Sequence, residues 1–463
     1  MPNAHELAPA CPRPAPQRVG MPWERSVGAG VHIRVSSAAV RAVLIARRFL
    51  AIAGIVGWQV AVLCAGQIAL LLALRGRARR QRFRGNRLAA LCTQLGATFV
   101  KVGQIMSTRP DLLPPHIIAG LGRLQDNVGS FASRHIERAF SEDFGKPPRD
   151  LFSAFSTAPI ASASVSQVHR ATLADGTEVA VKVRRPRIEQ IVGFDLAVMR
   201  FFARLLALRP SYRLLAPLES VNEFGAAIRM QIDFENEAEN NRRFHENFAG
   251  DDEVVLPRVI PELSSRRILT MTFIEGKKVL EATTDPGERT RLAQIGFRIL
   301  LKMVFADGFV HADLHPGNIL VTPAGKVALL DVGLTATLDE TSRRIFAQYF
   351  AAWAQSDGAA MARIMVEFSP SASVVDYPAF EGDVIAFCRR YVGKPLGEVQ
   401  VSTVAFEMMG ILRRHRVRVN PVFTMVNIAI AVTEGIGRQL DPSLDLLAQG
   451  VPFFAGLAST ARL

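Results

Sequence analysis

Hydrophobic and polar positions divide the chain into segments of different pattern. The longest apolar run covers residues 49–74, which include no charged residue. As a helix, this run of about 26 residues would be ~39 Å long, enough to cross a hydrocarbon core of ~30 Å. Two arginines precede it, and six follow it between residues 75 and 84. The pattern predicts a membrane-spanning helix. Gln59 and Gln67 leave a helix on the membrane surface, or in a soluble core, as alternatives.

The segment before this run has a different composition. Residues 1–40 are rich in proline and alanine and mildly basic, which predicts a disordered tail. No apolar core follows the first residues closely, so a signal peptide is not expected. Residues 41–84 then contain the apolar helix together with its basic flanks.

A second helical pattern covers residues 91–106, where apolar residues repeat at helical spacing. It contains the tetrapeptide Lys101-Val102-Gly103-Gln104. Taken alone, this tetrapeptide indicates only an exposed lysine and a glycine that ends the helix. The prolines between residues 108 and 115 then interrupt the helix.

Strand patterns begin after residue 151. Residues 168–173 read as a strand, Asp175-Gly176 is typical of a hairpin turn, and residues 178–183 read as the return strand. Residues 267–276 read as a further strand that runs into a glycine. Helical patterns lie in residues 224–248, 292–307 and most of 340–463. This mixture predicts an α+β fold.

The overall composition favours anionic partners. The 463 residues include 55 lysines and arginines against 42 aspartates and glutamates, a net charge of +13. Such a balance attracts nucleic acid, nucleotide phosphates or an anionic membrane surface. The basic residues do not alternate with aromatic residues as in a single-strand binder, so nucleic acid is not expected as a partner. The four cysteines lie far apart in the sequence, which argues against structural zinc and a disulfide framework.

The strongest chemical signal is the segment from His311 to Asn318, followed by Asp331. Asp313 lies five residues before Asn318, and Asp331 follows a short apolar run. Protein-kinase-like enzymes arrange a catalytic loop and a metal-binding aspartate in this order. Phosphoryl transfer uses a carboxylate near the attacking hydroxyl and oxygen ligands that hold Mg²⁺ against the nucleotide phosphates. Asp313 is therefore the candidate catalytic residue, and Asn318 and Asp331 are the candidate metal ligands.

Lys182 ends the sequence Val-Ala-Val-Lys in the predicted return strand, which matches the kinase strand whose lysine pairs the nucleotide phosphates. A strand lysine is commonly only an edge charge, but this one precedes Asp313 by a kinase-like interval. The loop before the hairpin has small residues where a kinase has glycines. It consists of Ala161, Ser162, Ala163, Ser164, Val165 and Ser166. Because this loop cannot freely adopt positive φ, it predicts altered nucleotide handling.

Two further segments complete the kinase-like pattern. The acidic helix contains Glu237, which is placed to pair with the strand lysine as the kinase αC glutamate does. Glu235 and Glu239 are its neighbours, spacing alone does not choose between the three, and a solvated acidic face is the alternative. The strand at residues 267–276 lies where kinases contact adenine, which makes Met271 and Phe273 candidate nucleotide contacts.

In this order, the motifs resemble those of the UbiB protein-kinase-like family, also called aarF or ADCK, over roughly residues 85–450. The resemblance rests on Lys101–Gln104, the Ala/Ser loop with Gln167-Val168-His169, Val179–Lys182, Asp233 with Glu237, His311–Asn318 and Asp331. Residues 433–442 also resemble the C-terminal region of that family. The resemblance implies a bilobal, protein-kinase-like fold with a family-specific helical extension at residues 85–150. An N-lobe at 151–276 and a helical C-lobe at 277–463 would follow.

The resemblance also implies a function. ATP and Mg²⁺ would be the cofactors, and Lys182, oriented by Glu237, would bind the phosphates. Lys101 and Gln104 would belong to an occluding helix that covers the protein-substrate site and reaches the nucleotide. The activity implied is ATP hydrolysis coupled to lipid or partner proteins, in support of isoprenoid-quinone (ubiquinone) biosynthesis. Two alternatives are a pseudokinase scaffold switched by nucleotide and a lipid-binding protein without turnover.

Location and partners follow from the same reasoning. The denser arginine cluster lies after residues 49–74, so the positive-inside rule predicts a cytoplasmic-membrane protein whose catalytic body faces the cytoplasm. Anionic membrane lipid and quinone-biosynthesis proteins are the expected partners. The paired C-terminal apolar segment that anchors some family members is absent, and residues 49–74 would take over this role.

Six positions depart from the family pattern. The family has Ala and Gly at two loop positions, Glu in the helix before Asp233, Glu in the hinge, Pro after the catalytic Asp, and Phe after the metal-binding Asp. The residues here are Ser162, Ser166, Gln231, Thr272, Leu314 and Val332. The ionisable residues of the site are intact, which favours nucleotide binding, whereas the change at Gln231 removes a charge from the occluding network.

Overall fold

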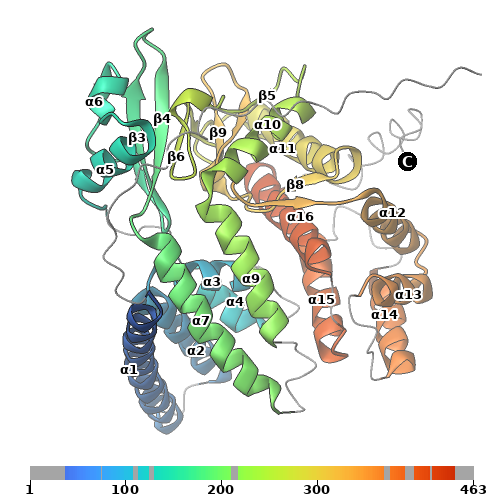
Figure 1. Cartoon of the computed structure of the whole chain (residues 1–463). Coiled ribbons are helices and arrows are strands. Elements are labelled where there is room, and N and C mark those ends of the chain that lie inside the picture. Colours follow the sequence, from blue (N-terminus) through green and yellow to red (C-terminus); the bar gives the residue numbers. More distant parts are fainter. Residues whose placement is uncertain are drawn as a thin grey trace, which may run out of the picture. The chain divides into compact units, whose positions relative to one another are not determined.

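The computed structural model describes residues 37–73, 76–107, 113–124, 130–209, 217–369, 376–391, 401–417 and 420–443 (Figure 1). By its internal contacts the chain forms two units, residues 1–44 and 45–463. In the first unit only the start of helix α1 (Ser37–Leu72) is described, so the predicted tail otherwise lies outside the described residues. The predicted helix break falls largely on residues 108–112, which lie outside them too.

An antiparallel sheet forms the N-lobe, in the order β1–β3–β4–β6, with β2 paired to β3. The strands are β1 (Ala154–Phe155), β2 (Ala161–Ser162), β3 (Ser166–Thr172), β4 (Glu178–Arg184) and β6 (Ile268–Thr272). The β3–β4 hairpin is the predicted one, and Gly176 at its turn has a φ of +86°. Helices α5 (Ser133–Phe144) and α6 (Pro148–Leu151) cover one face, where Phe140 packs with the buried valines of β4.

Between β4 and β5, the described residues form helices α7 (Ile188–Ala207), α9 (Pro217–Ile232) and α10 (Phe234–Asn247). The prediction of one continuous helix over residues 224–248 is wrong, because the chain breaks at Asp233. This residue has extended backbone angles, and its carboxylate accepts a hydrogen bond of 3.2 Å from the Glu235 amide. An aspartate in that geometry caps the N-terminus of a new helix. The break gives α10 its own direction and places it beside β6.

In the described part of the chain before α5, the helices are α1, α2 (Arg77–Leu95), α3 (Ala97–Ser107) and α4 (Pro115–Leu121). Two close glycine contacts hold α2, α3 and α4 together. A Cβ atom on Gly85 would lie 2.2 Å from the carbonyl oxygen of His116, and one on Gly103 would lie 2.3 Å from Leu124. Gly103 is buried and α3 continues to Ser107, so the expectation that this glycine ends the helix is wrong.

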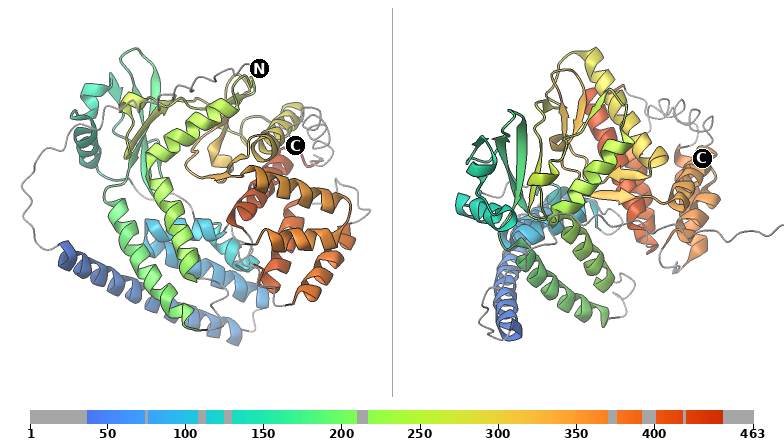
Figure 2. Two further views of the ribbon diagram at one scale, coloured as in Figure 1. Left: turned by 45° about the vertical axis from the view of Figure 1, so that its right-hand side comes forward. Right: turned by 45° about the horizontal axis from the view of Figure 1, so that its top comes forward.

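Helix α1 contains a stretch, Val43–Leu72, that is long and apolar enough to cross a membrane, and it alone does so among the described helices. Helix α2 runs beside α1, and α7 crosses near it (Figure 2). The small core between them contains Ile52, Leu95 and Val198. One face of α1 is therefore covered by the rest of the protein.

The C-lobe is mainly helical, as predicted. Its helices are α11 (Pro286–Leu301), continued by a π-helical turn, α12 (Glu340–Ala354), α13 (Gly358–Glu367), α14 (Tyr377–Tyr391), α15 (Val401–Arg414) and α16 (Pro421–Leu440). Its short strands are β5 (Val254–Val255), β7 (Lys277–Lys278), β8 (Phe309–His311), β9 (Ile319–Val321), β10 (Val327–Leu329) and β11 (Thr335–Thr337), in the orders β5–β10–β9–β7 and β11–β8. The largest hydrophobic core of the described residues lies here. The predicted α+β, kinase-like class is confirmed.

Candidate active site

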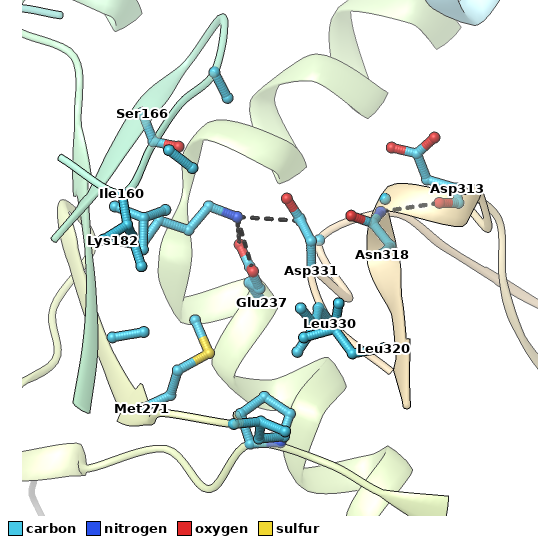
Figure 3. Close-up of a pocket in the computed structure, with 18 of the residues that line it drawn as sticks. Ile160, Ser166, Lys182, Glu237, Met271, Asp313, Asn318, Leu320, Leu330 and Asp331 are labelled. Atoms are coloured by element: carbon cyan, nitrogen blue, oxygen red, sulfur yellow. Dashed lines mark hydrogen bonds and ion pairs between the residues drawn. The ribbon is translucent and has the colours of Figure 1, made fainter. Parts of the chain in front are cut away.

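A cavity of about 630 Å³ lies between the N-lobe sheet and the loops around β9 (Figure 3). It brings together nearly all residues predicted for the site. Those lining it are Lys101, the loop from Ala161 to Ser166, Lys182, Glu237, Met271, Phe273, Asp313, Asn318 and Asp331. Gln104 is not among them, because its amide points to α4 and donates to the Leu124 carbonyl at 3.3 Å.

Lys182 occupies the centre of the polar end. Its ammonium donates to both carboxylate oxygens of Glu237 at 2.9 and 2.8 Å, and it lies 3.1 Å from an oxygen of Asp331. Glu237 is buried, whereas Glu235 and Glu239 are not. The structure therefore selects the middle glutamate, because only that position of α10 faces the cavity.

Burial and neighbouring charges determine the protonation of Lys182, Glu237 and Asp331. Burial lowers the pKa of Lys182, but the carboxylates of Asp331 and Glu237 raise it by more, so the ammonium form is stabilised. Burial raises the pKa of Glu237, and Lys182 opposes this only in part. Partial removal from water raises the pKa of the half-exposed Asp331, but the positive charges of Lys182 and Lys101 lower it by more, to well below its usual range. Asp331 is thus ionised, as a cation ligand must be.

His311 holds the loop that contains Asp313 and precedes Asn318. The buried imidazole accepts a hydrogen bond from the Asp313 amide at 3.2 Å and has its other nitrogen 3.2 Å from the Leu330 carbonyl. Burial lowers the pKa of His311, which favours the neutral ring with a proton on Nε2. Asn318 donates to the Asp313 carbonyl at 3.1 Å, which leaves its amide oxygen turned toward Asp331 (Figure 3). Asp331 itself has a φ of +46°.

Helix α3 contributes one charge to the cavity. The Lys101 ammonium lies 3.9 Å from a carboxylate oxygen of Asp313, and its side chain is largely buried. The polar end therefore combines two ammonium groups with three carboxylates. This excess of negative charge suits a divalent cation next to the nucleotide phosphates.

Arg185 stabilises the conformation of the Ala/Ser loop through two hydrogen bonds. The guanidinium donates to the Ala163 carbonyl at 2.9 Å and to the Ser162 hydroxyl at 3.0 Å. The Ala163 amide also donates to the Ser166 carbonyl at 2.8 Å. Although the loop lacks glycine, these hydrogen bonds hold it in a tight turn.

Two buried polar side chains of the cavity lack partners among the described residues. They are the hydroxyl of Ser166 and the whole side-chain amide of Gln231, and both residues line the cavity. A buried polar group without a partner costs about 1–3 kcal/mol. A polar ligand that forms hydrogen bonds with Ser166 and Gln231 would recover part of this free energy. Together with the charged groups at this end, these two side chains fit a nucleotide with its metal.

The other end of the cavity is apolar, and sequence reasoning missed it. Its lining includes Ile160, Val168, Ala180, Leu320 and Leu330, next to Met271. Strand alternation was the available signal, because Ala180 lies two residues before Lys182 and Val168 pairs with Lys182 across the hairpin. An apolar slot beside a charged end matches a planar base attached to phosphates.

Comparison with known proteins identifies the domains of this chain. Residues 123–365 match the ABC1 atypical kinase-like domain, and residues 384–445 match the UbiB helical domain. The chain is 35% identical over 378 residues to "Probable protein kinase UbiB" of Vibrio atlanticus, covering 80% of this chain and 70% of that protein. The chain belongs to the UbiB family. The protein of the same name from Aliivibrio fischeri is 34% identical over the same shares.

A solved structure shares the fold of this UbiB-family chain. It is Rv3197 of Mycobacterium tuberculosis, solved in complex with erythromycin, with a TM-score of 0.51 and 21% identity over 73% of this chain and 88% of that one. Within the UbiB pattern, two departures now have a place in the structure. Ser166 and Gln231, which replace Gly and Glu, are the two residues that present unpartnered polar atoms at the cavity.

Proposed function

We propose that this UbiB-family protein binds ATP with Mg²⁺ in the cavity and hydrolyses it. The observation that carries the proposal is the convergence of Lys182, Glu237, Asp313, Asn318 and Asp331 at one end of a cavity whose other end is apolar. An adenine ring fits the apolar end, and the phosphates then reach Lys182.

Each polar residue has a distinct role in this proposal. Lys182 neutralises phosphate charge while Glu237 holds it in place. Asn318 and Asp331 would hold Mg²⁺, which neutralises charge on the phosphates. Asp313 orients the attacking water and accepts its proton. His311 holds the backbone of this loop by accepting a hydrogen bond from the Asp313 amide.

Helix α3 favours water as the acceptor. Lys101 lies against Asp313, at the place where a hydroxyl substrate would meet that carboxylate. A protein side chain would have to displace this lysine, whereas a water molecule needs far less room. Hydrolysis is therefore a better match to the geometry than protein phosphorylation.

The same contact supports a second candidate function. As long as Lys101 pairs with Asp313, it competes for the carboxylate that should accept the proton. A nucleotide-switched scaffold would keep this pair closed and use ATP only to change the position of α3. Turnover separates the two functions.

The wider role comes from the family. We propose that the protein works at the cytoplasmic face of a membrane with anionic lipid and supports ubiquinone biosynthesis together with other proteins of that pathway. The UbiB relatives, the apolar helix α1 and the net positive charge support this proposal.

The test is ADP release by purified protein with Mg²⁺ and ATP, with and without anionic vesicles, compared with Asp313→Asn. Turnover that requires Asp313 and rises with vesicles is the expected result. Tight ATP binding without turnover in any condition would replace hydrolysis by the scaffold function.

A further inference from the structure

Helix α1 has an outer face without a polar residue. From Leu50 to Ala73 the exposed positions hold only alanine, glycine, leucine, valine, isoleucine, tryptophan and cysteine. Its large members, all at least half exposed, are Leu50, Trp58, Val60, Ile68, Leu71 and Leu72. This outer face runs for 24 residues, ~36 Å of helix at ~1.5 Å per residue. A helix lying on a soluble body normally exposes charged residues instead.

From residue 48 to the end of α1, the polar residues Arg48, Gln59 and Gln67 point the other way, into the protein. Arg48 pairs at 2.6 Å with Asp195 of α7, which is fully buried. Gln59 accepts from Arg87 and donates to Gln94 at 2.8 Å.

The contact with α2 continues toward the end of α1. The amide of Gln67 donates to the Arg80 carbonyl at 3.2 Å, and Phe83 fills the space above Gly66. Helix α1 is therefore attached to α2 and α7 from residue 48 to residue 67.

This attachment decides how α1 can meet a bilayer. Helix α2 has no apolar stripe comparable to that of α1. It contains six arginines: Arg77, Arg79, Arg80, Arg82, Arg84 and Arg87. If α1 crossed the membrane in this packing, α2 would have to enter the hydrocarbon with it, where arginine is strongly disfavoured. Only the outer face of α1 can contact lipid while α2 stays in the aqueous phase.

We infer that α1 lies in the plane of an anionic bilayer, with its outer face in the boundary between headgroups and acyl chains. The charges at both ends match this position. Arg47 is exposed at one end, and Arg77, Arg79, Arg82 and Arg84 are exposed near the other. No aspartate or glutamate occurs between Glu24 and Asp111. Arginines beside a buried apolar face reach lipid phosphates.

The apolar surface continues onto α7. Phe201 and Phe202 are partly exposed, and both rings contact Phe49 of α1, at centroid distances of 6.2 and 5.7 Å. A second copy of the chain fits this surface less well than lipid, because it would bring two arginine clusters together without acidic partners. The inference deepens the membrane part of the proposed function and rests on that part alone, so it is tested without nucleotide.

Depth measurements distinguish an in-plane helix from a spanning one. One cysteine is labelled with a fluorophore in the full chain: Leu50→Cys, the native exposed Cys64, or Leu71→Cys, each in a chain whose other native cysteines are replaced by alanine. Vesicles of phosphatidylcholine and phosphatidylglycerol contain lipids with quenchers at different depths. We expect the same shallow depth at all three positions. A deep Cys64 between two shallow ends, or no quenching at any position, would overturn the inference.

Charge insertion tests the surface itself. Trp58→Glu combined with Ile68→Glu changes two exposed positions and should weaken vesicle binding at least ~10-fold. The control is Met230→Glu, which is similarly exposed on α9, beside Val192. It should bind vesicles like the unaltered protein.

Circular dichroism confirms that the variants fold. Light scattering without lipid reports self-association. If the Trp58→Glu, Ile68→Glu variant were a monomer where the unaltered protein is a dimer, and bound vesicles equally well, the outer face would contact a second copy. This result would overturn the inference. Vesicle binding equal in all variants would overturn it as well.

Discussion

The change Glu237→Gln is the sharpest test of the candidate site, because glutamine keeps the shape of the side chain and removes only its charge. In the structure Lys182 is 6% exposed and lies between two carboxylates, at 2.8 Å from Glu237 and 3.1 Å from Asp331. After the change, Asp331 is the one anionic partner left to Lys182. The ammonium then stays on Asp331 and competes with the cation for that carboxylate.

The magnitude follows from this geometry. Breaking a buried ion pair outright costs about 3–5 kcal/mol. Here the glutamine oxygen still accepts one hydrogen bond from Lys182, and Asp331 still balances its charge, so the loss is smaller. Removing the partner that orients a metal-site group typically weakens binding about 10–100-fold, which corresponds to about 1.4–2.7 kcal/mol. We expect the affinity for ATP with Mg²⁺ to fall by this factor.

The assay is a fluorescence titration of the protein with a labelled ATP analogue in the presence of Mg²⁺. The matched control is Glu239→Gln, the same change two residues along α10, where the side chain is 62% exposed and pairs with Arg242. An exposed pair contributes about 0–1 kcal/mol to stability, and Glu239 is outside the cavity lining, so binding should change less than about twofold. If both variants and the unaltered protein bound ATP with equal affinity, Glu237 would not be the residue that holds Lys182 in place for ATP binding.

Further predictions concern the loop, the catalytic carboxylate, the core and the cation. Asp313→Asn should lower ATP turnover at least ~100-fold with ATP affinity nearly unchanged; a parallel loss of affinity would point to misfolding or to ligand binding instead. Arg185→Ala removes the two braces of the Ala/Ser loop and should raise the KM for ATP ~10-fold, measured by steady-state kinetics, and an unchanged KM would contradict the bracing role. Phe140→Ala, at a fully buried position, should lower the free energy of unfolding by about 3–5 kcal/mol in urea titrations, whereas a loss below about 1 kcal/mol would mean that the core under the N-lobe sheet collapses around the gap. Chelation of Mg²⁺ should abolish turnover and weaken ATP binding, and unaffected turnover would exclude Asn318 and Asp331 as metal ligands.

Local patterns predicted those parts of the molecule that depend on neighbouring residues in the chain. The β3–β4 hairpin follows from strand alternation around Asp175-Gly176, and its register then places Lys182 in the sheet. The proposed catalytic loop was recognisable because Asp313 and Asn318 have a fixed separation in sequence. Both are short-range relations, and the structure reproduces them.

Other features depend on contacts that are distant in sequence. The choice of Glu237 among three glutamates depends on the angle of α10, which Asp233 sets by capping a new helix. Aspartate before an acidic first turn was the available signal for that break. Gln104 points to α4 and away from the cavity, because α4 packs against α3 at Gly103.

Helix α1 shows the limit of an apolar-run argument. The sequence shows that residues 49–74 carry no charge, but it does not show that Gln59 and Gln67 form hydrogen bonds with α2. These partners lie 35 and 13 residues away along the chain. The same run of residues is therefore compatible with crossing a membrane or lying on it until the neighbouring helix is known.

The glycine contacts of α2, α3 and α4 make activity sensitive to positions remote from the nucleotide. A methyl group at Gly85 would meet the backbone of α4, so alanine there must move α2 or α4, which both pack against α3. A methyl group at Gly103 would meet the side chain of Leu124, so either α3 or that side chain must shift. Helix α3 carries Lys101, whose distance from Asp313 would then change although neither residue had been altered. In a random-mutagenesis screen, alanine at these glycines should therefore be recovered together with substitutions in the catalytic loop, as variants that fold and bind membranes but have altered turnover.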